Sequence, residues 1–290
     1  MATRLHAEPQ DIPDPNNLIG LGLCARTYQL GNIVRRIPIH RNEQLSIEGV
    51  RREAQIYRHL GRHPSIIECL SDSDSHVDLT FAANGNLEEY LKLQPDTPPG
   101  FHLKFARKAT EAVAYVHSKG VIHGDIAARR FLLDEQLNVK LCGFTYASFV
   151  GEKGLNIKSY RHFLPRDNMA PNTVKSDLFA LGCTLYEIME GKEPYAELPD
   201  HEVQELYKQK LFPNVYGLCC GNVILDCWNC KFSSAADIVD RIHVPAEPVA
   251  IPDEQAAGRI LNVIRDYWKL WWGLTLGRPD HSQKWKEAQE

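Results

Sequence analysis

The chain has 290 residues, 43% of them hydrophobic and 24% charged, which is long enough to bury the cores of two packed lobes. Its formal net charge of -4, with both signs interspersed, argues against a nucleic-acid partner. The first 17 residues lack the apolar stretch of a signal peptide, and the longest uncharged run, residues 211–225, is too short and broken to cross a bilayer.

We therefore expect an intracellular protein, cytoplasmic or nuclear, with no membrane contact. The eight cysteines are scattered, which is typical of reduced and largely buried thiols. A zinc site at Cys227 and Cys230 would need a second CxxC or a His pair to complete four ligands, and the sequence places neither suitably. Buried thiols are the favoured interpretation.

Residues 1–17 are polar and contain prolines, and they predict an unstructured lead-in. The next stretch spaces Gly20 and Gly22 as GxGxxA, with Ala25 in the third position. Alone, this spacing is weak, because it also opens dinucleotide-binding folds. Strands predicted on both sides, with no helix directly after, favour a glycine-rich hairpin instead.

The β-branched content of residues 32–38 predicts a strand, which carries Arg35 and Arg36. Residues 46–60 repeat their apolar side chains at helical spacing and predict an amphipathic helix that includes Glu53. A solvated glutamate is the ordinary explanation of one such residue on a helix. An exposed edge-strand position is the ordinary explanation of the arginines.

Residues 77–87 predict a further strand, a connection and the start of a helix. The three prolines of residues 94–100 predict a loop. Residues 102–118 place apolar side chains on one face of a helix, which Gly120 ends. The order is thus a strand-rich first part followed by a helical second part.

The stretch from residue 121 to residue 145, VIHGDIAARRFLLDEQLNVKLCGFT, holds the polar residues on which any chemistry depends. It places His-Gly-Asp at residues 123–125 before a predicted strand pair that runs into Gly-Phe-Thr at residues 143–145. This arrangement resembles the catalytic core of the eukaryotic protein kinases. The aminoglycoside and choline phosphotransferases share the HGD start but lack the segments that follow here.

Two later segments extend the resemblance. Residues 168–172, NMAPN, resemble the kinase Ala-Pro-Glu motif with Asn172 in place of Glu. Residues 176–188, SDLFALGCTLYEI, resemble the helix that forms the buried centre of the large kinase lobe. In that family the Asp of this helix, here Asp177, holds the backbone of the catalytic loop.

The resemblance implies an α+β, bilobal protein-kinase-like fold over residues 18–243. The small β-rich N-lobe would span about residues 18–82 and carry one αC helix, and the larger α-helical C-lobe would span about residues 83–243. Residues 244–290 would form a linker and a helical tail rich in aromatic side chains. The tail either packs on the large lobe or binds a partner.

The resemblance also implies roles for single residues. Asp125 would be the catalytic base, and Arg129 matches the Ala-Ala-Arg arrangement of tyrosine-kinase loops. Arg36, or Arg35 if the alignment shifts by one, stands where the phosphate-binding Lys is expected. The residues that would bind nucleotide are Gly20, Gly22, Arg36, Glu53, Thr80, Ala82 and Arg130.

Two of the residues that hold magnesium in kinases are replaced. Arg130 stands where Asn is expected, and Gly143 stands where Asp is expected. The site thereby gains two units of positive charge, and one such charge ~4 Å from a divalent ion costs about 8 kcal/mol at an effective dielectric near 20. We therefore expect no metal site and poor magnesium binding. ATP would still meet main-chain groups at Thr80 and Ala82, so nucleotide binding stays open.

These residues favour a pseudokinase, which binds or scaffolds a protein partner and retains little or no activity, with ATP bound without metal. The alternative is an active protein kinase that transfers phosphate from ATP to a protein hydroxyl with Asp125 as base. A third hypothesis is a kinase fold with no ligand.

Overall fold

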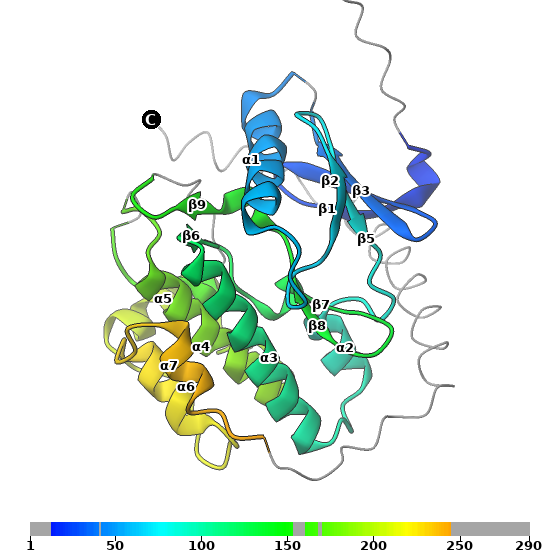
Figure 1. Ribbon diagram of the computed structural model, residues 1–290. Coiled ribbons are helices and arrows are strands. Elements are labelled where there is room, and N and C mark those ends of the chain that lie inside the picture. The colour runs from blue at the N-terminus through cyan, green and yellow to red at the C-terminus, as the bar shows by residue number, and fades with distance from the viewer. Residues whose placement is uncertain (1–12, 41, 153–159, 168–169, 245–290) are drawn as a thin grey trace, which may run out of the picture. The chain divides into compact units, whose positions relative to one another are not determined.

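The computed structural model describes residues 13–40, 42–152, 160–167 and 170–244 (Figure 1). The chain divides into two compact units, Met1–Ala250 and Ile251–Glu290. The second unit, with the predicted aromatic tail, lies outside the described residues, as does most of the predicted lead-in. All that follows concerns the first unit.

The N-terminal part is a five-stranded antiparallel sheet in the order β1-β2-β3-β5-β4. Its strands are β1 (Leu18–Leu21), β2 (Ala25–Leu30), β3 (Ile33–Pro38), β4 (Cys69–Asp72) and β5 (Val77–Thr80). Gly31 has φ +64° and closes the two-residue turn between β2 and β3, a conformation that glycine adopts without strain. The 3-10 helix η1 (Pro15–Asn17), capped by Asp14, falls inside the segment predicted to lack structure.

One long helix, α1 (Gln44–Leu60), lies beside this sheet (Figure 1). Its buried side chains include Val50, Ala54 and Tyr57, which recur at helical spacing as the sequence predicts. The helix ends at Gly61, whose φ of +66° stops the helical pattern. The sheet and the single helix confirm the predicted β-rich first part.

The remainder is helical. Its helices are α2 (Leu87–Leu93), α3 (Pro99–Ser118), α4 (Val174–Glu190), α5 (Asp200–Lys208), α6 (Gly221–Trp228) and α7 (Ala235–Val239). Its short strands form the pairs β6 (Val121–Ile122) with β9 (Ser148–Phe149) and β7 (Phe131–Leu133) with β8 (Val139–Leu141). Single 3-10 turns occur at η2 (Ala128–Arg130), η3 (Phe144–Tyr146) and η4 (Tyr160–His162). Among the helices described, none is both long and apolar enough to cross a membrane.

Helix α4 forms the buried centre of this helical part. Every residue from 176 to 188 is buried, because the helix is apolar on nearly all sides and packs against α3 and α6. Thr173 and Ser176 form a capping box at its start. The family resemblance predicted this central helix.

Asp177, in the first turn of α4, fastens the loop that follows β6. Its carboxylate accepts hydrogen bonds from the backbone N–H of His123 at 2.7 Å and of Gly124 at 3.0 Å, and it lies 3.0 Å from Nε2 of His117. Burial raises the pKa of Asp177, but the contact with His117 and the backbone donors lower it more, so the pKa lies below its ordinary value. The predicted tether is confirmed.

We expect Asp177→Asn to lower the free energy of unfolding by about 3 kcal/mol, because one amide oxygen cannot satisfy both buried N–H groups. Urea unfolding at pH 7 measures this loss. Since the folded-state pKa is depressed, the contribution is complete above the unfolded pKa of about 4 and is lost as pH falls through the folded value. Asp226→Asn, which removes a surface partner of Lys231, is the control and should change stability by less than about 1 kcal/mol. Equal losses for the two variants would contradict the tether.

Candidate functional site

Asp125 lies between β6 and η2 and is 6% exposed. Its Oδ1 accepts a hydrogen bond from Nη2 of Arg129 at 2.6 Å, and its Oδ2 accepts one from Nε of Arg130 at 2.7 Å. Nη2 of Arg130 also donates to Oδ2. The 3-10 turn η2 brings both guanidinium groups to the same carboxylate, so both of its oxygens are occupied.

These contacts make Asp125 a weak proton acceptor. Burial raises the pKa of Asp125, but the charges of Arg130 and Arg129 outweigh burial and lower it below its ordinary value. A general base is most effective when its pKa lies near the operating pH and an oxygen is free to receive the proton. The pKa of Asp125 is shifted away from that range, and each of its oxygens already accepts a hydrogen bond from an arginine.

Arg130 occupies the space beside Gly143. Gly143 has φ +83°, and a Cβ atom built on it would lie 3.0 Å from Nη1 and 3.1 Å from Cδ of Arg130. The arginine therefore fills the volume that a side chain at position 143 would need. In the sequence, Arg130 and Gly143 are two separate departures from the kinase pattern. In the structure, the side chain of Arg130 occupies the space that Gly143 leaves.

Arg36 forms an ion pair with Glu53 of α1, with 2.9 Å between Nε and Oε2. Its Nη1 donates to Thr27 at 3.2 Å and its Nη2 to Thr145 at 3.3 Å. Arg35 points to the opposite face of the strand and pairs with Asp78 at 2.7 Å. The sequence allowed either Arg35 or Arg36 at the position of the phosphate-binding Lys. In the structure Arg36 is the one that faces α1.

The role of Thr145 escaped the sequence analysis. Its hydroxyl donates to Oε2 of Glu53 at 3.0 Å and accepts from Arg36, so it joins β3, α1 and η3. Thr145 stands where the kinase pattern has glycine, so the pattern itself predicts no side-chain hydrogen bond at this position. Only the departure from that pattern could have pointed to it.

The glycine-rich hairpin lies over Arg36. Gly20 is in β1, where an added Cβ would meet Cβ of Thr27 at 3.3 Å, and the N–H of Gly22 donates to the carbonyl of Ala25 at 2.9 Å. The hairpin reaches the arginine through Thr27. Both glycines therefore lie where the sequence analysis placed them, on a tight strand-turn-strand.

Thr80 and Ala82 lie at the connection from β5 to α2. The N–H of Thr80 donates to the carbonyl of Glu68 at 3.0 Å, and the carbonyl of Ala82 accepts from Gly85 at 3.2 Å. Within the described ranges, the Ala82 N–H has no backbone partner. Ala82 itself is buried, and among the described residues no hydrogen bond joins this connection to Asp125.

Gly124 and Asn172 also fit one another. Gly124 has φ +78°, and a Cβ on it would lie 2.6 Å from Nδ2 of Asn172 and 2.9 Å from the carbonyl of Tyr146. Asn172 is buried and accepts a hydrogen bond from Arg166 at 2.8 Å. A side chain at position 124 therefore has no room here.

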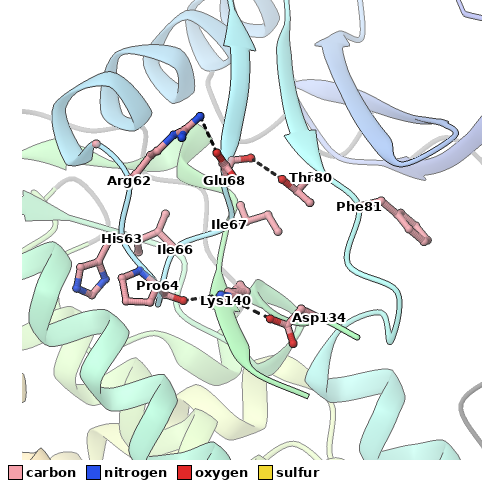
Figure 2. A pocket seen from close by; sticks show the side chains of 11 residues that line it. Arg62, His63, Pro64, Ile66, Ile67, Glu68, Thr80, Phe81, Asp134 and Lys140 are labelled. Carbon is pink, nitrogen blue, oxygen red and sulfur yellow. Dashed lines mark hydrogen bonds and ion pairs between the residues drawn. The ribbon is translucent and has the colours of Figure 1, made fainter. Parts of the chain in front are cut away.

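A hollow of about 420 Å³ lies between the segment that links α1 to β4, the end of β5 and the β7–β8 hairpin (Figure 2). Its charged groups are paired within its own wall: Arg62 with Glu68 at 2.8 Å and Lys140 with Asp134 at 3.6 Å. Lys140 also donates to the carbonyl of Pro64 at 2.7 Å. Of the predicted nucleotide-binding residues it shares only Thr80. Because its charges are satisfied, the hollow indicates no ligand class.

We expect Asp125→Asn to lower the free energy of unfolding by about 1–3 kcal/mol, because it leaves Arg129 and Arg130 without their carboxylate. Both arginines keep some solvent contact, which reduces the loss. Urea unfolding measures it, with Glu135→Gln on the exposed β7–β8 turn as the control. A variant as stable as the parent, or more stable, would show that the ion pairs do not form.

Residues 32–239 match the profile of the family described as protein tyrosine and serine/threonine kinase. The human tyrosine-protein kinase FRK is 31% identical over 201 residues, which cover 62% of this chain and 39% of FRK. Fibroblast growth factor receptor 1 of Pleurodeles waltl is 28% identical over 66% of this chain and 28% of the receptor. Fibroblast growth factor receptor homolog 1 of Drosophila melanogaster is 29% identical over 54% of this chain and 26% of the receptor.

The matched segments thus span about a quarter to two fifths of these relatives. The family match covers more than half of this chain, and its range contains β3, β4, β5, α1, Asp125 and α4. The chain therefore belongs to the protein tyrosine and serine/threonine kinase family.

Proposed function

We propose that this protein is a pseudokinase, which acts by binding or scaffolding a protein partner rather than by phosphoryl transfer. The observation that carries the proposal is the guanidinium of Arg130, ion-paired with Asp125 and packed over Gly143. It takes the place of one metal-holding side chain and fills the space of another. Positioning and metal ions supply most of the catalysis in this family, so little activity remains without them.

The net charge of the groups around Glu53 and Asp125 supports nucleotide binding without magnesium. Three guanidinium groups, those of Arg36, Arg129 and Arg130, lie with the two carboxylates of Glu53 and Asp125. Three positive and two negative charges leave a net charge of +1. Asn and Asp at positions 130 and 143 would leave -1, a charge that attracts a divalent ion instead.

A kinase domain implies ATP binding, and the main-chain groups at Ala82 support it in this chain. The N–H of Ala82 is free to donate to an adenine ring, and that contact does not depend on the side chain. Arg36 and Arg130 would then stand in for the missing cations at the phosphates. The proposed ligand is ATP, bound without magnesium.

The alternative is an active protein kinase with Asp125 as base. Two observations favour it: the ion pair between Arg36 and Glu53 is formed, and Asp125 itself is retained. Arg129 would then orient a substrate hydroxyl. A protein partner and an intracellular site of action are predictions from the sequence.

We expect ATP to raise the melting temperature at least as much in EDTA as in excess magnesium, because the guanidinium groups replace the cations. Thermal-shift titration of the full chain measures this. As a matched control, the double variant Arg130→Asn with Gly143→Asp restores the family residues and should make the shift depend on magnesium. Strict magnesium dependence of the parent would refute metal-free binding.

We expect phosphate transfer from radiolabelled ATP to a mixed protein substrate to be at background for the parent. Loss of ~4 kcal/mol of transition-state stabilisation alone slows a reaction about a thousandfold. Asp125→Ala should leave the signal unchanged. Robust transfer by the parent that this substitution abolishes would establish the active kinase instead.

A further inference from the structure

Glu53, the buried acid of helix α1, ties the helix to β3 and η3. Glu53 is fully buried, and its Oε1 has no hydrogen-bond partner among the described residues. Its Oε2 receives two donors, Arg36 at 2.9 Å and Thr145 at 3.0 Å. Since a buried carboxylate is stable only when it is paired and hydrogen-bonded, these two donors decide the position of the helix.

Thr145 connects three segments that are distant in the sequence. Its hydroxyl donates to Glu53 of α1 and accepts from Nη2 of Arg36 of β3, while its own backbone belongs to η3. The hydroxyl thus closes a ring of three hydrogen bonds that includes the ion pair. The side chain is 5% exposed, so water competes little for these bonds.

The methyl group of Thr145 packs against the same helix. A Cβ added to Gly49 would lie 2.8 Å from Cγ2 of Thr145 and 2.8 Å from Cβ of Cys24. Helix α1 therefore approaches η3 and the glycine-rich hairpin as closely as a residue without a side chain permits. Any outward movement of the helix would break both the hydrogen bond and this contact.

Other contacts hold the middle and the C-terminal end of the helix. Arg52 pairs with Glu152 at 2.8 Å, and Nε2 of His59 lies 2.8 Å from the carbonyl of Lys119. Tyr115 donates to the carbonyl of Leu60 at the last turn. These contacts support α1 in addition to the hydrogen bonds of Glu53.

We propose that the Thr145 hydroxyl locks helix α1 against β3 and η3 in the protein without ligand. In this chain α1 then keeps one fixed arrangement and does not move toward and away from these two segments. The proposal goes beyond the proposed function and does not depend on it. It requires neither ATP binding nor the absence of phosphate transfer.

Hydrogen–deuterium exchange of the full chain without nucleotide tests the lock. Thr145→Val keeps the shape of the side chain and removes the hydroxyl, and we expect exchange in residues 44–60 to rise roughly tenfold while α4 is unchanged. Thr184→Val is the matched control, since that buried hydroxyl bonds only within α4, to Ala180 at 3.0 Å. It should leave α1 at parent levels.

A second pair isolates the hydroxyl even if the valine variant fails to fold. Thr145→Ser and Thr145→Ala differ only in that oxygen, so the serine variant should protect α1 more strongly than the alanine variant. Equal protection of α1 in this pair, or a rise in exchange that is the same in α1 and α4, would overturn the proposal. The first result would make the hydroxyl irrelevant, and the second would make it part of general stability.

Discussion

The ion pair between Arg130 and Asp125 is the interaction on which the character of the cleft depends. Arg130 is the last residue of the 3-10 turn η2, from which its side chain reaches back to the carboxylate, and Gly143 leaves the space in which its guanidinium lies. The pairing lowers the pKa of Asp125 and occupies its oxygens. A side chain at position 143 would displace the arginine, so the two departures from the kinase pattern depend on each other.

The contacts that hold the scaffold are separate from those that would perform chemistry. Asp177 binds the backbone of the loop before Asp125, and Glu187, on the same helix, accepts from the backbone N–H of Ala128 at 3.1 Å. Both carboxylates are buried in α4 and address main-chain groups. The loop can therefore keep its course while the side chains that it presents change. This separation explains how the kinase fold persists in a chain that has Arg130 and Gly143 where the kinase pattern has Asn and Asp.

Helix α1 is likewise held by contacts within the chain. In many proteins a helix at a binding site is positioned by the ligand, whereas here Oε2 of Glu53 is bound by Arg36 and Thr145 within the chain. The connection from α1 to β4 is also bound to β8, through Lys140 and the carbonyl of Pro64 (Figure 2).

Local patterns could predict most of the elements. The periodicity of residues 46–60 and 102–118 fixed two helices, and the structure extends each by two or three residues at its start. The glycine spacing, the HGD stretch and the α4 segment arranged them in the order of a kinase. What local patterns could not supply is the partner of each polar side chain, because a partner 92 residues away leaves no local signal.

The sequence by itself determined the fold and the departures from the kinase pattern at positions 130 and 143, since both depend on residue type at fixed positions along the chain. Only the tertiary structure decided that Arg36 rather than Arg35 faces Glu53, because the alternation of a strand must be seen against the helix that covers one face. It likewise decided that Arg130 fills the space over Gly143 and that Thr145 bonds Glu53. Side-chain charges attract in many directions, and only the packed backbone selects which of them meet.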